Sequence, residues 1–328
     1  MRSRDAVVCS TLPGVNTSLF LPWSRSLTLR AATILSTAAL ALGCTSSDTP
    51  AAAPADAATE LDLSPMGSNR PVTPYVPASY TAGTPTPLIV LLHGYGASGF
   101  LQTAYFSLQQ ASEERGFVLL APNGTPDTSG SRFWNATDAC CDFGATNVDD
   151  VAYISGLINE AKARFTIDEK RVYLIGHSNG GFMSYRMACD RANTIAAVAS
   201  LAGAMWFDET KCKPSEPVAV LQIHGTADEV VNYNGGSLKS GTFPGAKVTA
   251  EDWARSNGCS LQPDTSAAPR DLVTDTAGSE TTTAAYGTGC KPGGHAELWS
   301  LEGAPHIPGL QKAFTPAVID FLYAHPKP

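Results

Sequence analysis

Short apolar runs alternate with longer stretches of mixed polarity along the chain, from about residue 88 to its end. Apolar runs of this length are typical of strands that are buried on both faces of a sheet. We expect six such strands, at Leu88–Leu92, Phe117–Ala121, Arg171–Ile175, Ile195–Ala199, Val218–Ile223 and Glu297–Leu301. Strands that alternate with helical stretches predict an α/β fold, in which a mostly parallel central sheet carries helices on both faces.

The clearest helical pattern lies between residues 147 and 165. Its apolar positions recur at helical spacing on one face: Val151, Ile154, Ile158, Ala161 and Phe165. We expect this helix to begin near Asn147, with Asp149 and Asp150 in its first turn, where the helix dipole favours carboxylates. Two further helices are predicted at Ala250–Ser256 and Pro316–Ala324.

A short motif follows the third expected strand directly. Residues 176–181 read Gly-His-Ser-Asn-Gly-Gly, and Phe182 and Met183 then begin a pattern of helical spacing. A G-x-S-x-G sequence between a buried strand and a helix is typical of a serine nucleophile, held in a tight turn that exposes its hydroxyl. Gly176 and Gly180 lack the Cβ atoms that would clash in such a turn. Ser178 is therefore a candidate nucleophile; a Gly-rich surface turn is the alternative interpretation.

The loops after two later strands carry a carboxylate and an imidazole. Asp228 follows Val218–Ile223, and His306 follows Glu297–Leu301. The carboxyl ends of parallel strands meet at one edge of a sheet, where active sites of such folds lie. The order Ser178, Asp228, His306 is the chain order of α/β-hydrolases. We expect His306 to act as the base and Asp228 to orient it.

The loop after the first strand supplies groups for the developing oxyanion. This loop begins with His93 and continues through Gly94 and Tyr95. We expect one backbone N–H from Gly94 or Tyr95, together with that of Asn179, to form the oxyanion hole. Aromatic and imidazole side chains that follow strands are candidates for the substrate pocket, with core or lid packing as the alternative: Tyr95, His177, Trp134 and Trp206.

Two catalytic assignments have rivals in the sequence. Glu229 is the alternative carboxylate to Asp228, and His295 is the alternative base to His306. We favour His306 because His295 precedes the last expected strand and should lie at the opposite end of the sheet. The other two histidines in these loops are expected to form local hydrogen bonds: His93 and His224.

Residues 1–44 differ in character from the rest. Arg25 and Arg30 precede an uncharged apolar stretch at residues 31–42, which is too short to span a bilayer and has the layout of a secretory signal. Leu40-Ala41-Leu42-Gly43-Cys44 resembles a bacterial lipoprotein cleavage site, so Cys44 is a lipidation candidate; an ordinary signal peptide is the alternative. Residues 45–69 include an Ala-, Pro-, Thr- and Ser-rich tether. Residues 70–328 are expected to form one catalytic domain.

Charge and cysteine usage exclude some classes of partner. The formal net charge is −8 and the pI is about 5.2, which argues against nucleic acid or anionic membrane surfaces as partners. We therefore expect the protein to associate with a membrane only through its N-terminal lipid anchor. No C-x-x-C pair occurs and the six histidines show no metal-ligand spacing, so we expect neither a metal nor a cofactor.

Six cysteines lie outside the leader, and an even number in an exported protein predicts up to three disulfides. We expect Cys259 to pair with Cys290, and Cys189 with Cys212. The adjacent residues Cys140 and Cys141 are expected not to bond each other easily, because this needs a strained peptide; their partners stay open.

Several of these motifs together resemble those of the exported polyhydroxybutyrate depolymerase-like and feruloyl esterase-like hydrolases. The likeness runs from about Pro71 to Phe321. One departure is Ala304–Pro308, where relatives usually have Gly-Gly-His followed by Trp-Pro. The motifs that carry the resemblance are Gly176–Met183 with His93-Gly94, Trp134-Asn135 with Cys140-Cys141, Val148–Val151 and His224–Asp228.

The resemblance implies hydrolysis of carboxylic esters by a Ser-His-Asp triad through an acyl-enzyme, without a cofactor. The substrates that it implies are feruloyl or acetyl esters of xylan, or hydroxybutyrate oligomers, and it does not choose among them. Two alternatives remain: a non-catalytic tethered surface protein of the same fold, and a peptidase of the same fold. An assay for hydrolysis of these esters distinguishes an esterase from both alternatives.

Overall fold

The computed structural model describes residues 61–328. The expected signal segment, Cys44 and residues 45–60 of the tether therefore lie outside the described residues. Among the described residues, no helix has the length and apolarity needed to cross a membrane.

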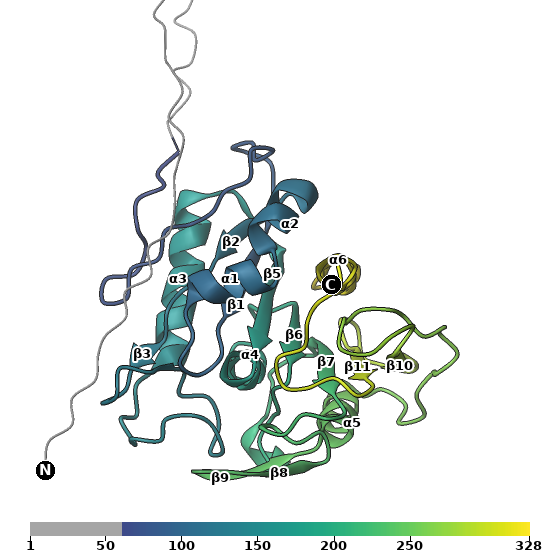
Figure 1. The fold of residues 1–328 in the computed structure, drawn as a ribbon. Helices are drawn as coiled ribbons and strands as arrows, with labels where there is room; N and C mark the ends of the chain where they lie inside the picture. Colours follow the sequence, from purple (N-terminus) through teal and green to yellow (C-terminus); the bar gives the residue numbers. More distant parts are fainter. Residues whose placement is uncertain (1–60) are drawn as a thin grey trace, which may run out of the picture. The chain divides into compact units, whose positions relative to one another are not determined.

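Seven strands form the central sheet, in the order β10-β11-β7-β6-β5-β1-β2 (Figure 1). Every neighbouring pair is parallel except β10 and β11. The expected α/β fold with a mostly parallel sheet is confirmed, and each of the six expected strands is present. The strands are β1 (Thr86–Leu92), β2 (Val118–Leu120), β5 (Ile167–His177), β6 (Ala197–Leu201), β7 (Ala219–Gly225), β10 (Thr281–Tyr286) and β11 (Ala296–Leu301).

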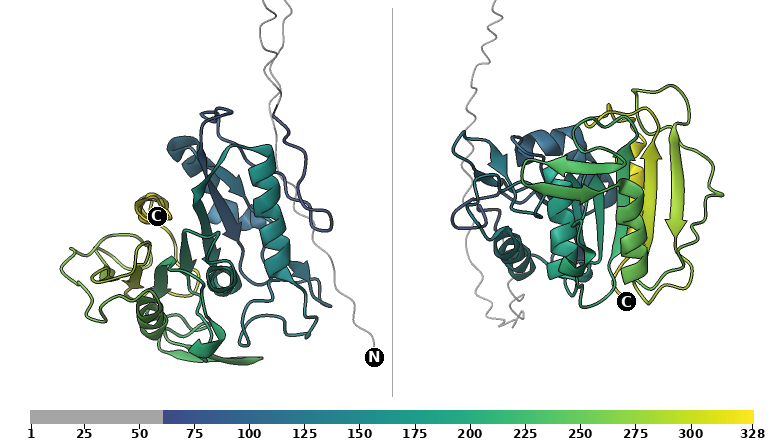
Figure 2. Two further views of the ribbon diagram at one scale, coloured as in Figure 1. Left: turned by 180° about the vertical axis from the view of Figure 1, so that it is seen from behind. Right: turned by 90° about the horizontal axis from the view of Figure 1, so that it is seen from below.

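Helices cover both faces of this sheet, as the views from behind and below show (Figure 2). Leu88, Val90 and Leu92 of β1 belong to the same hydrophobic cluster as side chains of α3, α4 and α5, whereas Ile89 and Leu91 belong to the cluster that contains side chains of α2 and α6. Successive residues of β1 thus enter opposite hydrophobic layers, which is why the strand is apolar throughout. The helices are α1 (Gly99–Tyr105), α2 (Leu108–Arg115), α3 (Asp150–Arg164), α4 (Asn179–Asp190), α5 (Ala246–Ser256) and α6 (Phe314–Ala324), with a 3₁₀ turn at Glu209–Lys211.

Helix α3 begins close to its expected position. Asp149 is its N-cap and accepts a hydrogen bond from the N–H of Ala152 at 2.8 Å, and Asp150 is the first helical residue. The expected start near Asn147 was therefore early by about one turn. Capping by Asp149 satisfies one of the free N–H groups at the helix start.

Strand β10 was not expected. It is an edge strand of sequence Thr-Thr-Thr-Ala-Ala-Tyr with several partly exposed positions, and it lacks the apolar run that marks the buried strands. Two small hairpins also escaped the sequence pattern. They pair β3 (Thr125–Pro126) with β4 (Arg132–Phe133), and β8 (Gly235–Leu238) with β9 (Gly241–Pro244).

Three disulfides are present. The expected pairs are confirmed: Cys259 bonds Cys290, and Cys189 bonds Cys212, with Cα atoms 3.9 Å and 5.3 Å apart. The expectation for the adjacent pair was wrong, because Cys140 and Cys141 bond each other. Their peptide bond is cis and their Cα atoms lie 3.0 Å apart, an arrangement that is rare outside proline and that sequence alone does not indicate.

Candidate active site

Ser178 occupies the turn between β5 and α4. Its φ and ψ are 53° and −120°, a region that non-glycine residues seldom occupy. Its N–H donates to the carbonyl of Leu201 at the end of β6, at 2.8 Å. A Cβ on Gly176 would lie 2.1 Å from the carbonyl oxygen of Gly180, and one on Gly180 would lie 2.0 Å from that of Leu92. The turn therefore requires both glycines, as the motif predicts.

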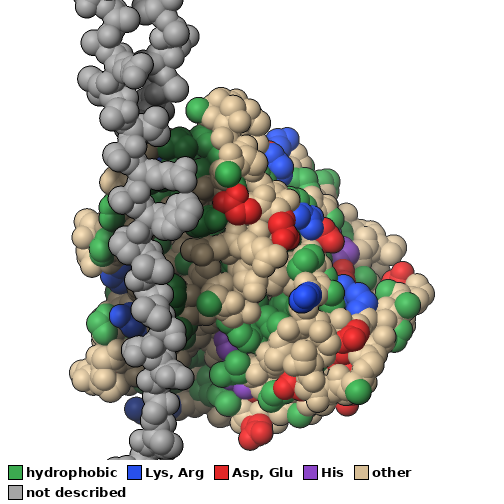
Figure 3. Space-filling model, turned by 45° about the horizontal axis from the view of Figure 1, so that its top comes forward, with side chains coloured by type: hydrophobic (Ala, Val, Ile, Leu, Met, Phe, Trp, Pro, Cys, Tyr) green, Lys and Arg blue, Asp and Glu red, His purple; other side chains and the backbone are tan. Residues whose placement is uncertain are grey.

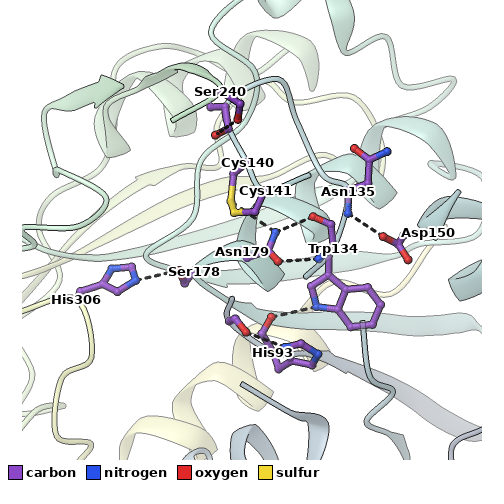
Figure 4. Close-up of a disulfide and its surroundings, with 12 residues drawn as sticks. His93, Trp134, Asn135, Cys140, Cys141, Asp150, Ser178, Asn179, Ser240 and His306 are labelled. Atoms are coloured by element: carbon purple, nitrogen blue, oxygen red, sulfur yellow. Dashed lines mark hydrogen bonds between the residues drawn. A yellow bond between two sulfur atoms is a disulfide. The ribbon is translucent and has the colours of Figure 1, made fainter. Parts of the chain in front are cut away.

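His306, in the loop after β11, reaches the serine across the edge of the sheet. Its Nε2 lies 2.9 Å from Oγ of Ser178, and its Nδ1 lies 2.7 Å from Oδ2 of Asp228. In Figure 4 the imidazole points directly at Ser178. An ionised Asp228 only accepts, so Nδ1 carries the ring proton and the lone pair of Nε2 faces the hydroxyl. This tautomer can take a proton from Ser178.

Asp228, in the loop after β7, is buried and fully hydrogen-bonded. Oδ1 accepts from the N–H groups of Val230 and Val231 at 2.8 Å each, and Nε2 of His224 lies 3.2 Å from Oδ2. Burial by itself would raise the pKa of Asp228, but hydrogen bonds from His224 and His306 outweigh it and hold the pKa below its ordinary value. The carboxylate is thus ionised at neutral pH.

The neighbouring Glu229 is exposed to solvent. Of the two rival carboxylates, the structure places Asp228 against His306.

His177 contacts the backbone of the loop that carries His306. Its Nε2 lies 3.0 Å from the carbonyl oxygen of His306, which can only accept, so Nε2 is the donor. Burial lowers the pKa of His177 to about 4. A neutral ring at neutral pH keeps positive charge away from His306 while still anchoring its backbone.

Two backbone N–H groups beside Ser178 have no acceptor among residues 61–328: those of Tyr95 and Asn179. Asn179 is the first residue of α4, where N–H groups lack intrahelical partners. The N–H of Gly94 is occupied, because it donates to Oε1 of Gln102 at 3.2 Å. Gly94 is therefore removed from the expected oxyanion donors. A Cβ on Gly94 would lie 3.5 Å from Cβ of Ser178, so this loop passes against the serine.

A cavity of about 380 Å³ opens beside Ser178. Tyr95 and His177 line it. Most of its other side chains are apolar, with several exposed at its rim; they are Ala97, Leu101, Tyr105, Val230 and Ile307.

Two pocket predictions were wrong. Trp134 is 0% exposed and Trp206 is 7% exposed, and both pack in the core beneath the site rather than lining the cavity. Trp134 and Trp206 instead belong to the hydrophobic cluster that also contains side chains of α3 and α4. An aromatic side chain gains more by full burial there than at a wet cavity wall.

His295 and His325 lie away from the serine. His295 precedes β11 and contacts Oε2 of Glu297 at 3.2 Å, and its ring lies 4.4 Å from that of His325. It is thus at the opposite end of the strand that leads to His306. His93 and His224 make the local hydrogen bonds that we expected.

Sequence reasoning missed the contribution of α1. Leu101 and Tyr105 line the cavity, Gln102 holds the N–H of Gly94, and the Tyr105 hydroxyl donates to the carbonyl of Pro308 at 2.6 Å. The seven-residue helix is too short for periodicity to reveal. The one available signal was Ser98, which caps it by accepting from the N–H of Leu101.

On the face drawn in Figure 3, acidic and basic side chains of the described residues are interspersed. In residues 61–328, no group of three or more His, Cys, Asp or Glu side chains is arranged to hold a metal ion.

Comparisons with known proteins show which family and which relatives the chain resembles. Residues 80–243 match the phospholipase/carboxylesterase family. Feruloyl esterase B of Piromyces equi is 33% identical over 202 residues, 59% of this chain and 37% of that protein. Feruloyl esterase D of Neurospora crassa is 30% identical over 245 residues, 74% of this chain and 75% of that protein.

Acetyl xylan esterase from Aspergillus awamori has a similar structure, with a TM-score of 0.53 at 16% identity. The likeness covers 78% of this chain and 94% of that one, and at this identity it shows the fold alone. Three relatives are longer than this chain, which matches only part of each. The matched region spans 37% of feruloyl esterase B, 23% of a bifunctional acetylxylan esterase/xylanase of Neocallimastix patriciarum and 44% of a putative esterase of Nocardia uniformis.

Proposed function

The chain belongs to the phospholipase/carboxylesterase family of α/β-hydrolases, and from this premise we propose that it hydrolyses carboxylic esters through Ser178. The observation that carries the proposal is the continuous hydrogen-bonded chain from Oγ of Ser178 through the imidazole of His306 to Asp228, with distances of 2.9 Å and 2.7 Å. These are the contacts that general-base activation of a serine requires.

The first half of the reaction forms an acyl-enzyme. Oγ of Ser178 attacks the ester carbonyl carbon while its proton passes to Nε2 of His306, and Asp228 stabilises the resulting imidazolium. The N–H groups of Asn179 and Tyr95 donate to the oxyanion; one such donor contributes about 10²–10³-fold to kcat. Collapse of the tetrahedral intermediate breaks the bond to the alcohol oxygen, which leaves with the proton from His306.

The second half returns the enzyme to its starting state. His306 takes a proton from a water molecule, whose oxygen attacks the acyl carbon. The bond to Oγ then breaks and Ser178 recovers its proton from the imidazolium, releasing the carboxylic acid.

Apolar and aromatic acyl esters suit the cavity best. Its walls are mainly Leu101, Tyr105, Val230 and Ile307, and its volume of about 380 Å³ is in the range of small-ligand sites. An acetyl group would leave much of this apolar surface in contact with water. We therefore place feruloyl esters of xylan first among the substrates, ahead of acetyl esters and hydroxybutyrate oligomers.

A substrate panel tests this proposal. Purified chain would be assayed on methyl ferulate, acetylated xylan, hydroxybutyrate oligomers and a short aryl ester, with Ser178→Ala as the matched control. We expect hydrolysis of methyl ferulate and of the aryl ester by the native chain alone. No hydrolysis of any ester would favour a non-catalytic protein of the same fold.

We also propose export and anchoring through Cys44, with residues 70–328 as the catalytic domain. The proposal rests on the basic, apolar and Leu-Ala-Leu-Gly-Cys sequence of the first 44 residues. Cys44→Ser should move the enzyme from the membrane fraction to the soluble exported fraction in a bacterial host that processes lipoproteins. Unchanged membrane fractionation would contradict the anchor.

A further inference from the structure

We propose that Trp134 is a positioning residue that fixes the positions of the two oxyanion donors, the N–H groups of Asn179 and Tyr95, relative to each other. The proposal rests on the proposed ester hydrolysis. Trp134 lies outside the substrate cavity, yet its backbone and its indole each hold one side of the oxyanion hole. Figure 4 shows it between Asn179 and His93.

The backbone of Trp134 holds the side chain of Asn179. Its N–H donates to Oδ1 of Asn179 at 2.7 Å, and its carbonyl accepts from Nδ2 at 2.9 Å. Two bonds to a planar carboxamide fix its position and its rotation. Asn179 is fully buried and is the first residue of α4, so these bonds tie the donor end of the helix to the segment that contains Trp134.

The indole of Trp134 holds the other side. Nε1–H donates to the backbone carbonyl of His93 at 3.0 Å, and the indole lies against the His93 ring with centroids 5.1 Å apart. The next carbonyl, that of Gly94, accepts from Nδ1 of His93 at 2.7 Å. The carbonyl of Gly94 and the N–H of Tyr95 belong to one planar peptide. Holding the carbonyl therefore sets the direction of the donor.

The protonation state of His93 suits this task. The N–H of Gly124 can only donate, and it lies 2.9 Å from Nε2, so Nε2 is the acceptor and Nδ1 carries the proton. Burial lowers the pKa of His93 to about 4. The ring is neutral at neutral pH, and the bond to Gly94 is retained.

The segment that contains Trp134 is itself anchored to α3. The N–H of Asn135 donates to Oδ2 of Asp150 at 2.7 Å, and Oδ1 of Asp150 binds Arg70 at 2.6 Å. The guanidinium of Arg70 also lies over the ring of Tyr153, 3.6 Å from its centroid. Trp134 is thus held in place by α3, and it forms hydrogen bonds with both chain segments that carry the donors. An oxyanion hole needs such fixed donors because their value depends on their direction.

The test compares two identical substitutions in buried tryptophans. Trp134→Phe keeps an aromatic ring and removes the bond to His93. Trp253→Phe is the control: Trp253 is as deeply buried, packs on Tyr185, and its Nε1 has no partner among the described residues. A second variant, Asn179→Ala, keeps the N–H donor but removes both bonds to Trp134. Melting curves would show that each variant is folded at the assay temperature.

We expect Trp134→Phe and Asn179→Ala each to lower kcat about 10-fold, less than the loss of a whole donor, with KM within about twofold of the native value. The affinity for a trifluoromethyl ketone, which forms an oxyanion on Ser178, should fall by the same factor as kcat/KM. Trp253→Phe should change neither quantity.

Two results would overturn the inference while leaving the proposed function intact. One is a native-like kcat and ketone affinity in folded Trp134→Phe and Asn179→Ala. The other is a rise in KM with unchanged kcat, which would mean that the tryptophan supports substrate binding instead. Absence of ester hydrolysis in the native chain would overturn the proposed function, and this inference with it.

Discussion

Nε2 of His306 lies 2.9 Å from Oγ of Ser178, although 128 residues separate them in the sequence. The contact exists because β5 and β11 are parallel members of one sheet, so the loops that follow them emerge at the same edge. Asp228 follows β7, the strand beside β11, and completes the chain of hydrogen bonds. The topology of the sheet thus brings together three side chains that are far apart in the sequence.

Replacement of each candidate base by alanine tests this arrangement. His306→Ala should cost about as much kcat as removal of Ser178, about 10⁴-fold or more, because the two residues act as one unit. His295→Ala should change kcat by only a few-fold, since His295 lies before β11 and contacts Glu297. Steady-state kinetics on an aryl ester measures both. The reverse ranking would mean that the base is wrongly assigned.

Asp228 and Glu229 form a second matched pair. Asp228→Asn removes the charge that stabilises the imidazolium and favours the wrong tautomer of His306, so kcat should fall by about 10³–10⁴-fold. Glu229→Gln changes an exposed neighbour and should leave kcat within about twofold of the native value, on the order of the usual neutral surface change. Equal losses in the two variants would contradict the orienting role of Asp228.

Acid should weaken the fold before the carboxylates titrate. Burial holds the pKa of His93 and of His177 at about 4, whereas an unfolded histidine has a pKa of about 6.5. As the pH falls from about 6.5 to about 4, the unfolded chain binds protons that the folded chain does not, so the free energy of unfolding decreases. Each histidine contributes up to about 1.4 kcal/mol per pH unit.

Urea unfolding at pH 7, 6 and 5 measures this slope, and His93→Gln should make it shallower. Stability that is constant or that increases on acidification over this range would show that the two rings are not buried in their neutral form.

The disulfides should differ in their effect on stability. Cys259 and Cys290 are 31 residues apart, and replacing both with Ala should lower the free energy of unfolding by about 2–4 kcal/mol, because the unfolded chain is no longer constrained. Cys140 and Cys141 are adjacent, so their bond closes no long loop and its loss should cost much less by this mechanism. Urea unfolding of the oxidised variants compares them, and non-reducing peptide mapping checks the pairing. Six free thiols would contradict the prediction.

The sequence pattern predicted the elements whose environment is uniform. Strands buried on both faces, such as β1, are apolar throughout, and the tight turn at Ser178 requires glycines at fixed positions. Strand β10 was missed because it is a half-exposed edge strand, and α1 because seven residues give too little periodicity.

Tertiary placement limited the site prediction in a different way. Trp134 and Tyr95 both lie in loops at the same edge of the sheet. Trp134 is nevertheless fully buried, whereas Tyr95 is 40% exposed. That difference depends on how residues 134–141 fold back against Asn179 and α3, which no local pattern records. The bonds from Trp134 to Asn179 and His93 join residues 45 and 41 positions apart, and they became visible only in the structure.

Covalent trapping tests the central claim most directly. The native chain would be incubated with an aryl phosphonate ester, which phosphonylates an activated serine, and the modified residue would be mapped by peptide mass spectrometry. The account predicts one stoichiometric adduct on Ser178, matched loss of ester hydrolysis, and no adduct in Ser178→Ala. Ester hydrolysis that persists with Ser178 fully modified, or an adduct at another residue that tracks the loss of activity, would contradict it.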